Sequence, residues 1–202
     1  MKTDQEENKP QTKLNSGKEG KLLTRIAFIA LFAAFTAAGA FIAIPVGPVP
    51  IVLQNLFAVL AGLILGPVMG GAAVGLYLLA GILGLPVFAG GTGGIARLAG
   101  PTGGFLLGYF FAALAAGFIA GNSRDNVKIK LPRLIAAVIS GFLIIYIPGI
   151  IWLKTSRNLG WIQAVMAGFV PFIIGDALKG IAAVLITPRL RRTASEFLNG
   201  ER

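Results

Sequence analysis

Six apolar segments follow one another along the chain, separated by short stretches that contain most of the prolines and charges. They cover residues 22–44, 51–65, 68–85, 105–120, 134–153 and 161–186. An α-helix needs about 20 apolar residues to cross the hydrocarbon of a bilayer. The second and third segments are short enough to form one re-entrant unit, but Gly66 and Pro67 between them are typical of a turn and favour two helices. The pattern predicts an all-α polytopic membrane protein, a bundle of six transmembrane helices.

The composition agrees with a membrane protein. Of the 202 residues, 55% are hydrophobic and 13% are charged, whereas soluble domains carry about 25% charged residues. Residues 1–21 are polar instead, and we expect them to form a disordered cytoplasmic tail. Residues 22–192 are expected to form a single six-helix transmembrane domain.

The positive charges are distributed unevenly between the two sides of this topology. The chain has 18 Lys and Arg against 8 Asp and Glu. Fourteen of the 18 fall on one side: six up to Arg25, four after the fourth span and four near the C-terminus. The other side has Arg97, Lys154 and Arg157. Cytoplasmic loops carry the excess of Lys and Arg, so both termini are expected in the cytoplasm, and the basic character needs no nucleic-acid partner.

The chain contains neither Cys nor His. It therefore lacks thiol nucleophiles, disulfides, imidazole bases and the ligands of most transition-metal sites. No metal site, cofactor or catalytic residue is expected, and we predict that the protein is not an enzyme. A nucleotide-binding P-loop is also absent, because no Gly-Lys-Ser/Thr follows the glycine-rich loop.

Asp176 and Lys179 are the acid and the base that lie well inside a predicted span. They are three residues apart, so they share one face of a helix. Each costs about 2.5–3.5 kcal/mol at the centre of a membrane helix. Charges in such places usually mark function, which favours a polar ligand site or an ion path. A structural ion pair that locks two helices is the alternative.

Two further polar features flank the spans. Gln54 and Asn55 offer adjacent amide donors and acceptors at the start of the second span; hydrogen bonds between helices would explain them equally well. The loop at 86–104 is rich in glycine and contains Arg97. Free backbone N–H groups ahead of a helix suit an anion, and an Arg can hold a carboxylate with two hydrogen bonds. The alternative is a flexible outer loop.

Ala30, Ala34 and Ala38 recur at four-residue spacing on the first span. Four residues make about one helical turn, so the three form a smooth strip that lets another helix approach closely. The strip is expected either to pack inside the bundle or to dock a partner membrane protein.

Several motifs resemble those of one family when they are taken together and in order. They are residues 48–56 (PVPIVLQNL), 61–67 (AGLILGP), 84–91 (GLPVFAGG), 100–104 (GPTGG), Tyr146 with Gly149 and 152–153, and 171–179 (PFIIGDALK). The set covers about residues 44–179 and resembles the BioY family, the biotin-binding S components of energy-coupling-factor transporters.

The resemblance implies that residues 22–192 capture biotin from outside the cell, with biotin as transported substrate and no cofactor. It implies partners as well: a transmembrane coupling (T) subunit that docks on small residues of the first helix, two ATPase subunits, and the surrounding membrane lipids. The candidate ligand-binding residues are then Gln54, Asn55, Gly91, Arg97, Asp176 and Lys179, and the candidate docking residues are Ala30, Ala34 and Ala38.

Biotin has ureido N–H donors, a ureido carbonyl and a carboxylate, and each needs a partner. Asp176 can accept from the ureido N–H groups, and Gln54 or Lys179 can donate to the carbonyl. Arg97 or the backbone of residues 90–94, which include Gly91, can hold the carboxylate; the reverse orientation stays open. The competing hypotheses are an S component for riboflavin or thiamin, and an ion-coupled carrier with Asp176 as its proton site. Whether the protein works with or without coupling subunits also stays open.

Overall fold

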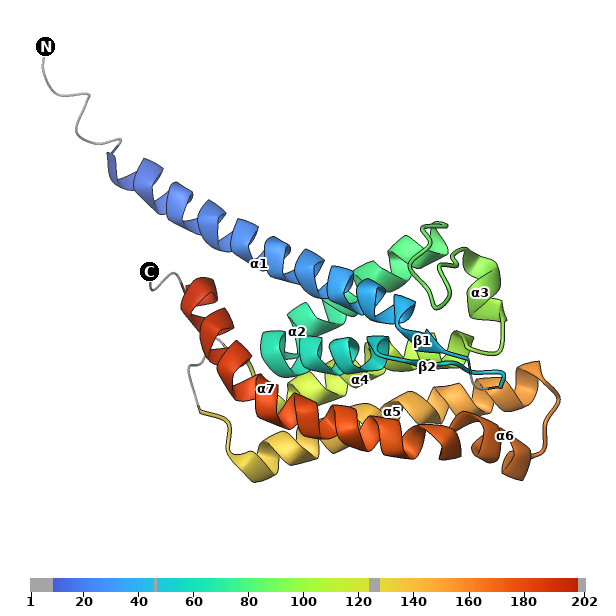
Figure 1. The fold of residues 1–202 in the computed structure, drawn as a ribbon. Coiled ribbons are helices and arrows are strands. Elements are labelled where there is room, and N and C mark those ends of the chain that lie inside the picture. Colours follow the sequence, from blue (N-terminus) through green and yellow to red (C-terminus); the bar gives the residue numbers. More distant parts are fainter. Residues whose placement is uncertain (1–8, 46, 124–127, 200–202) are drawn as a thin grey trace, which may run out of the picture.

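Long helices lie side by side in the computed structural model of the chain (Figure 1), which describes residues 9–45, 47–123 and 128–199. The elements are, in order, α1 (Lys9–Phe41), β1 (Ala43–Ile44), β2 (Ile51–Val52), α2 (Gln54–Ile82), α3 (Ile95–Ala99), α4 (Gly103–Ala120), α5 (Leu131–Ser156), α6 (Trp161–Gly168), the 3-10 helix η2 (Val170–Phe172) and α7 (Ile173–Asn199). The two short strands pair antiparallel, Ala43 with Val52 and Ile44 with Ile51. The predicted all-α fold is confirmed.

The surface of this bundle is apolar, as expected of a chain that spans a membrane. Among the described residues, five helical stretches are long and apolar enough to cross a bilayer. Large aliphatic side chains point outward from them: Ile162, Val68 and Ile174 expose 81%, 77% and 77% of their surface. Helices satisfy their own backbone hydrogen bonds, which is why they can face lipid.

One of these five stretches, α2, is a helical hairpin. Gly66 has a positive φ of 81° and non-helical backbone inside α2, and Pro67 follows it. The side chains of Gln54 and Tyr77 are hydrogen-bonded at 3.2 Å, although a straight helix would place them about 35 Å apart. The chain therefore runs along the bundle twice in α2. The predicted turn at Gly66 and Pro67 is confirmed, and the six-span count agrees with the structure.

The last predicted span, 161–186, is not one helix. Backbone dihedrals leave the helical region at Phe169, and η2 then leads into α7. Pro171 explains the break, because proline lacks an N–H and clashes with the preceding turn of a helix. The prediction of a continuous helix was wrong at this point. α7 then continues to Asn199, beyond the predicted boundary at 192, with Leu198 buried.

The two ends of the bundle differ. The β1–β2 hairpin, α3 and α6 lie at one end, here called the loop end (Figure 1). The other, here called the basic end, holds the start of α1, the bend of α2 and the end of α7. α1 begins at Lys9, within the predicted tail at 1–21; residues 1–8 lie outside the described part of the chain, and disorder of the tail stays a prediction.

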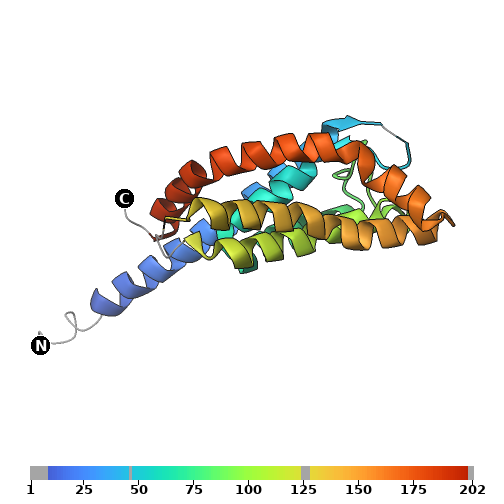
Figure 2. The ribbon, with the colours of Figure 1, turned by 90° about the horizontal axis from the view of Figure 1, so that it is seen from below.

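Glycines allow the central helices to approach closely. α4 packs between α2 and α5, and α5 in turn lies between α4 and α7 (Figure 2). A Cβ atom on Gly108 would lie 2.7 Å from the carbonyl oxygen of Ile145 on α5, and one on Gly117 would lie 2.5 Å from the nitrogen of Pro67 on α2. No larger residue fits at these positions, so the glycines set the spacing of the helices that carry the polar residues.

Candidate functional site

A charged pair lies buried in the first turns of α7. The Lys179 Nζ and the Asp176 Oδ1 are 2.9 Å apart, and each residue is only 8% exposed. The break at η2 makes Asp176 part of the first turn of α7. A carboxylate is stabilised there by the helix dipole. Pro171 thus determines where the acid sits, and the predicted shared face of Asp176 and Lys179 is confirmed.

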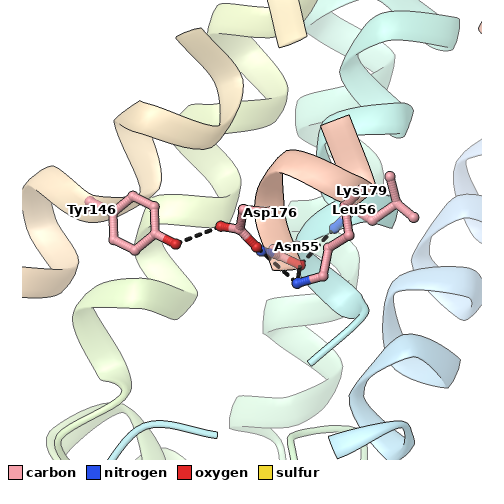
Figure 3. Close-up of polar contacts among 5 residues, drawn as sticks. All are labelled: Asn55, Leu56, Tyr146, Asp176 and Lys179. Atoms are coloured by element: carbon pink, nitrogen blue, oxygen red, sulfur yellow. Dashed lines mark hydrogen bonds and ion pairs between the residues drawn. The ribbon is translucent and has the colours of Figure 1, made fainter. Parts of the chain in front are cut away.

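Asn55, from the first turn of α2, closes this pair into a triangle (Figure 3). Its Nδ2 donates to the Asp176 Oδ1 at 2.9 Å, and its Oδ1 accepts from the Lys179 Nζ at 3.0 Å. One amide therefore satisfies both charges and joins α2 to α7. The interhelical hydrogen bonds considered for Asn55 are present.

Tyr146 of α5 completes the cluster. Its hydroxyl donates to the Asp176 Oδ2 at 2.5 Å (Figure 3). Phe105 and Phe169 pack edge-on against the Tyr146 ring, with centroids 6.2 and 4.7 Å away. Both carboxylate oxygens of Asp176 thus accept hydrogen bonds, and the charges balance within the cluster. A buried ion pair is tolerated under these conditions.

Gln54 lies beside this cluster with half of its amide unused. It is 2% exposed, and its Nε2 donates to the Tyr77 hydroxyl at 3.2 Å. Its Oε1 is buried and has no hydrogen-bond partner among the described residues. Buried polar atoms are nearly always paired, so this oxygen is an acceptor available to a ligand's N–H group.

Two small adjoining cavities of about 20 Å³ each lie below the β1–β2 connection. Both are lined by Val49, Pro50, Val52, Phe105 and Tyr109. One of them also reaches Gln54 and Arg97, and the other reaches Asn55 and Tyr146. The polar side chains of α2, α3 and α5 therefore converge on one region with apolar walls.

Arg97 and the glycine-rich loop form the side of this region. Arg97 donates from Nη2 to the carbonyl of Ala89 at 3.1 Å, and Gly94 N donates to Gly81 O at 2.7 Å. The loop is therefore tied to α2 and folded around Arg97. Gly91 has a φ of 67°, and its N–H donates to the carbonyl of Phe88 at 3.0 Å. It lines neither cavity, and its role toward an anion stays a prediction.

The tyrosines are the site residues to which sequence reasoning gave no role. The chain contains three, and all three belong to this region: Tyr77 pairs with Gln54, Tyr146 pairs with Asp176, and Tyr109 lines both cavities. A buried Tyr hydroxyl usually needs a partner. Three tyrosines placed inside apolar spans were the signal that could have revealed them.

The alanine strip of α1 faces away from the bundle. Ala30, Ala34 and Ala38 are all exposed. Other small residues of α1, such as Ala33 and Thr36, are buried instead and face the bundle. The strip does not serve internal packing, and it is available to a partner in the membrane.

These features define a class of protein. A transmembrane bundle with a polar, loop-capped chamber near one surface is typical of proteins that bind or move a small solute. Among the described residues, no cluster of three His, Cys, Asp or Glu could hold a metal ion. The BioY family model matches residues 8–196, and the chain belongs to the BioY family.

Individual relatives agree with this assignment. The chain is 42% identical over 166 residues to the probable biotin transporter BioY of Pyrococcus horikoshii, which covers 82% of this chain and 95% of the relative. It is 39% identical over 166 residues to the biotin transporter BioY of Thermotoga maritima, with the same coverage. The crystal structure of the S-component for biotin from an ECF-type ABC transporter is similar at a TM-score of 0.76 and 34% identity, over 84% of this chain and 92% of that one.

The charge balance of the cluster leads to a stability prediction. Asp176→Asn is expected to destabilise the protein by about 3–5 kcal/mol, because it leaves the Lys179 ammonium buried without its counter-charge. The double variant Asp176→Asn, Lys179→Met removes both charges and should recover most of this loss. Thermal unfolding of wild type and the two variants in the same detergent measures the loss and its recovery. A double variant no more stable than the single one would contradict the charge-balance account.

Proposed function

We propose that this protein binds biotin in the chamber below the β1–β2 connection and mediates its uptake as an S component. The observation that carries the proposal is the buried, unpaired Gln54 Oε1, which lines the same chamber as Asn55 and Tyr146 of the Asp176 cluster. The family and its relatives support biotin as the solute. The protein is a transport component and not an enzyme.

The chamber and the Asp176 cluster beside it offer a partner for each polar group of biotin. The ureido N–H groups need acceptors: Gln54 Oε1 lines the chamber, whereas the Asp176 carboxylate lines neither cavity and is hydrogen-bonded to Asn55 and Tyr146, which do. The ureido carbonyl needs a donor, such as the Lys179 ammonium, which also lies behind Asn55. Biotin would therefore have to displace part of these hydrogen bonds to reach the charged pair. Phe105 and Tyr109 provide apolar walls for the fused rings. Arg97 lines the other part of the chamber and can hold the carboxylate. We therefore infer that the ureido ring points toward Asp176 and the carboxylate toward Arg97.

Entry of biotin requires the loops over the chamber to move. Each cavity holds about 20 Å³, room for about one water, whereas small-molecule sites enclose about 300–1,000 Å³. The cap is small: β1 and β2 are two residues long, and Leu53 N ties the end of the hairpin to Gly39 O at 3.1 Å. Outward movement of this hairpin would withdraw Val49 and Val52 from the walls of the chamber and so open it.

The charge distribution supports a chamber that opens to the outside. Most Lys and Arg belong to the basic end, which the positive-inside rule assigns to the cytoplasm together with both termini. The protein is then a multi-pass cell-membrane protein that captures biotin from outside. The chain carries no P-loop, so energy for release would come from a T subunit and two ATPase subunits docked on the exposed alanine strip.

Calorimetry in detergent tests biotin recognition directly. Biotin should bind wild-type protein, and riboflavin and thiamin should not. Arg97→Gln should weaken biotin binding about 10- to 100-fold, because a hydrogen bond between charged groups is worth about 1.5–3 kcal/mol. Biotinamide, which lacks the carboxylate, should bind wild type and Arg97→Gln equally. The matched control is Arg157→Gln at an exposed position outside the chamber.

Two results would contradict this account. If biotin gives no heat of binding while another vitamin gives a clear heat, the proposal that biotin is the substrate is refuted. Equal weakening of biotin and biotinamide by Arg97→Gln would mean that Arg97 supports the loop through Ala89 and does not contact the carboxylate.

The exposed strip on α1 leads to a separate prediction about partners. Ala34→Trp should abolish co-purification with tagged coupling subunits, because helix association in lipid depends on close packing, and it should leave biotin binding unchanged. Phe118→Trp, at an exposed position of α4 away from the strip, is the control and should keep the complex. If Ala34→Trp retains the coupling subunits, the partner docks elsewhere.

A further inference from the structure

An apolar groove runs between α5 and α7 on the outside of the bundle. It has a volume of about 470 Å³, and fourteen residues line it. They lie at 135–146 of α5, at 173–185 of α7 and at Phe169, and Asp176 is the charged residue among them. Ile139, Ile181 and Leu185 line it and are 53%, 58% and 70% exposed. The groove therefore opens toward the lipid.

The length of this groove matches one lipid chain. From residue 173 to residue 185 a helix rises about 18 Å, and the hydrocarbon of one leaflet is about 15 Å thick, half of the bilayer core. Gly180 lies midway along the groove, where a Cβ would sit 3.4 Å from the Val138 Cγ1 of α5. Gly180 therefore lets α7 approach α5 closely, and without a side chain it leaves the floor of the groove open.

A second cavity, of about 660 Å³, follows the groove toward the basic end. Pro188, three residues after Leu185 on α7, lies in its wall, as does Ile129, six residues before Ile135 on α5. The described lining includes Lys128, Arg191 and Arg192 and no acidic residue. Glu196 contacts Arg192 at 3.3 Å from outside this lining. The described side chains of this lining are therefore basic, and they lie in line with the apolar groove; this cavity is here called the basic cavity.

Two buried hydroxyl groups face this basic cavity. Ser123 and Ser195 line it and are each 2% exposed. The Ser195 Oγ accepts from Asn199, whereas the Ser123 Oγ has no hydrogen-bond partner among the described residues. A hydroxyl can donate to an anionic oxygen. Arg191 donates to the carbonyls of Leu63 and Gly121 and so holds the wall in place.

We propose that this seam between α5 and α7 holds one anionic phospholipid from the leaflet at the basic end. Its phosphate lies in the basic cavity near Ser123, Lys128 and Arg192, and one acyl chain lies in the groove over Gly180. The chain ends near Tyr146 and Asp176, which join α5 to α7. The bound lipid stabilises the packing of these two helices. The proposal does not rest on the identity of the solute in the chamber.

Native mass spectrometry and thermal unfolding test the lipid site on the full chain in detergent. The probes are phosphatidylglycerol, phosphatidylcholine with the same chains, and inorganic phosphate. Phosphatidylglycerol should be retained and should raise the unfolding temperature. Phosphatidylcholine lacks the net negative charge, and inorganic phosphate lacks the acyl chains. Neither should therefore raise the unfolding temperature as much as phosphatidylglycerol does.

Variants separate the two halves of the site. Each basic side chain contributes about fivefold to the affinity for an anionic lipid surface. The double variant Lys128→Gln, Arg192→Gln should therefore lower the affinity for phosphatidylglycerol about 25-fold. Lys130→Gln with Arg189→Gln removes the same charge at exposed positions outside the cavity and should have little effect. Gly180→Leu should block the chain, whereas Leu178→Phe adds bulk outside the groove and should not.

Three outcomes would overturn the proposal. Equal retention of the two lipids would show that the cavity does not select charge. Equal weakening by both charge pairs would show bulk electrostatic attraction only. Inorganic phosphate could also stabilise the protein as strongly as phosphatidylglycerol does, with no effect of Gly180→Leu. That result would show an anion site that does not bind the acyl chain. Each variant is compared with its own baseline in phosphatidylcholine, so a change in intrinsic stability does not obscure the result.

Discussion

The buried pair of Asp176 and Lys179 determines much of this structure. Two charges inside the membrane are costly unless they are paired and hydrogen-bonded. Asn55 bonds to both charges, and Tyr146 bonds to the free oxygen of the carboxylate. The pair therefore requires α2, α5 and α7 to meet at one level of the bundle. The packing of these three helices fixes the positions of hydrogen-bond donors and acceptors around the chamber. Such a chamber can recognise a small polar solute.

Backbone breaks place these side chains. The bend at Gly66 returns α2 to the loop end, so that Gln54 meets Tyr77. The break before α7 sets Asp176 in a first turn. The glycines of α4 keep its neighbours close. Two interrupted helices and one small-residue helix thus position a polar cluster below a cap of short strands, and a cap of this size can move independently of the helices.

Sequence alone predicted the six apolar segments, the bend at Gly66 and the shared face of Asp176 and Lys179, because hydropathy and helical spacing report on single elements. It did not predict the break at Phe169, since that stretch is apolar throughout and Pro171 was the remaining signal. It left open which side of α1 bears the alanine strip. Contacts such as Tyr146 to Asp176, 30 residues apart, depend on helix packing that no spacing rule encodes.

The central claim is that biotin binds between the Asp176 cluster and Arg97. A structure of the protein with biotin, determined in lipid, tests it most directly. We expect the ureido ring within hydrogen-bond distance of Asp176 and Gln54, the carboxylate at Arg97, and the β1–β2 connection displaced to make room. Biotin bound elsewhere, with the bonds among Asn55, Asp176 and Lys179 unchanged and no contact to Gln54, would contradict the account.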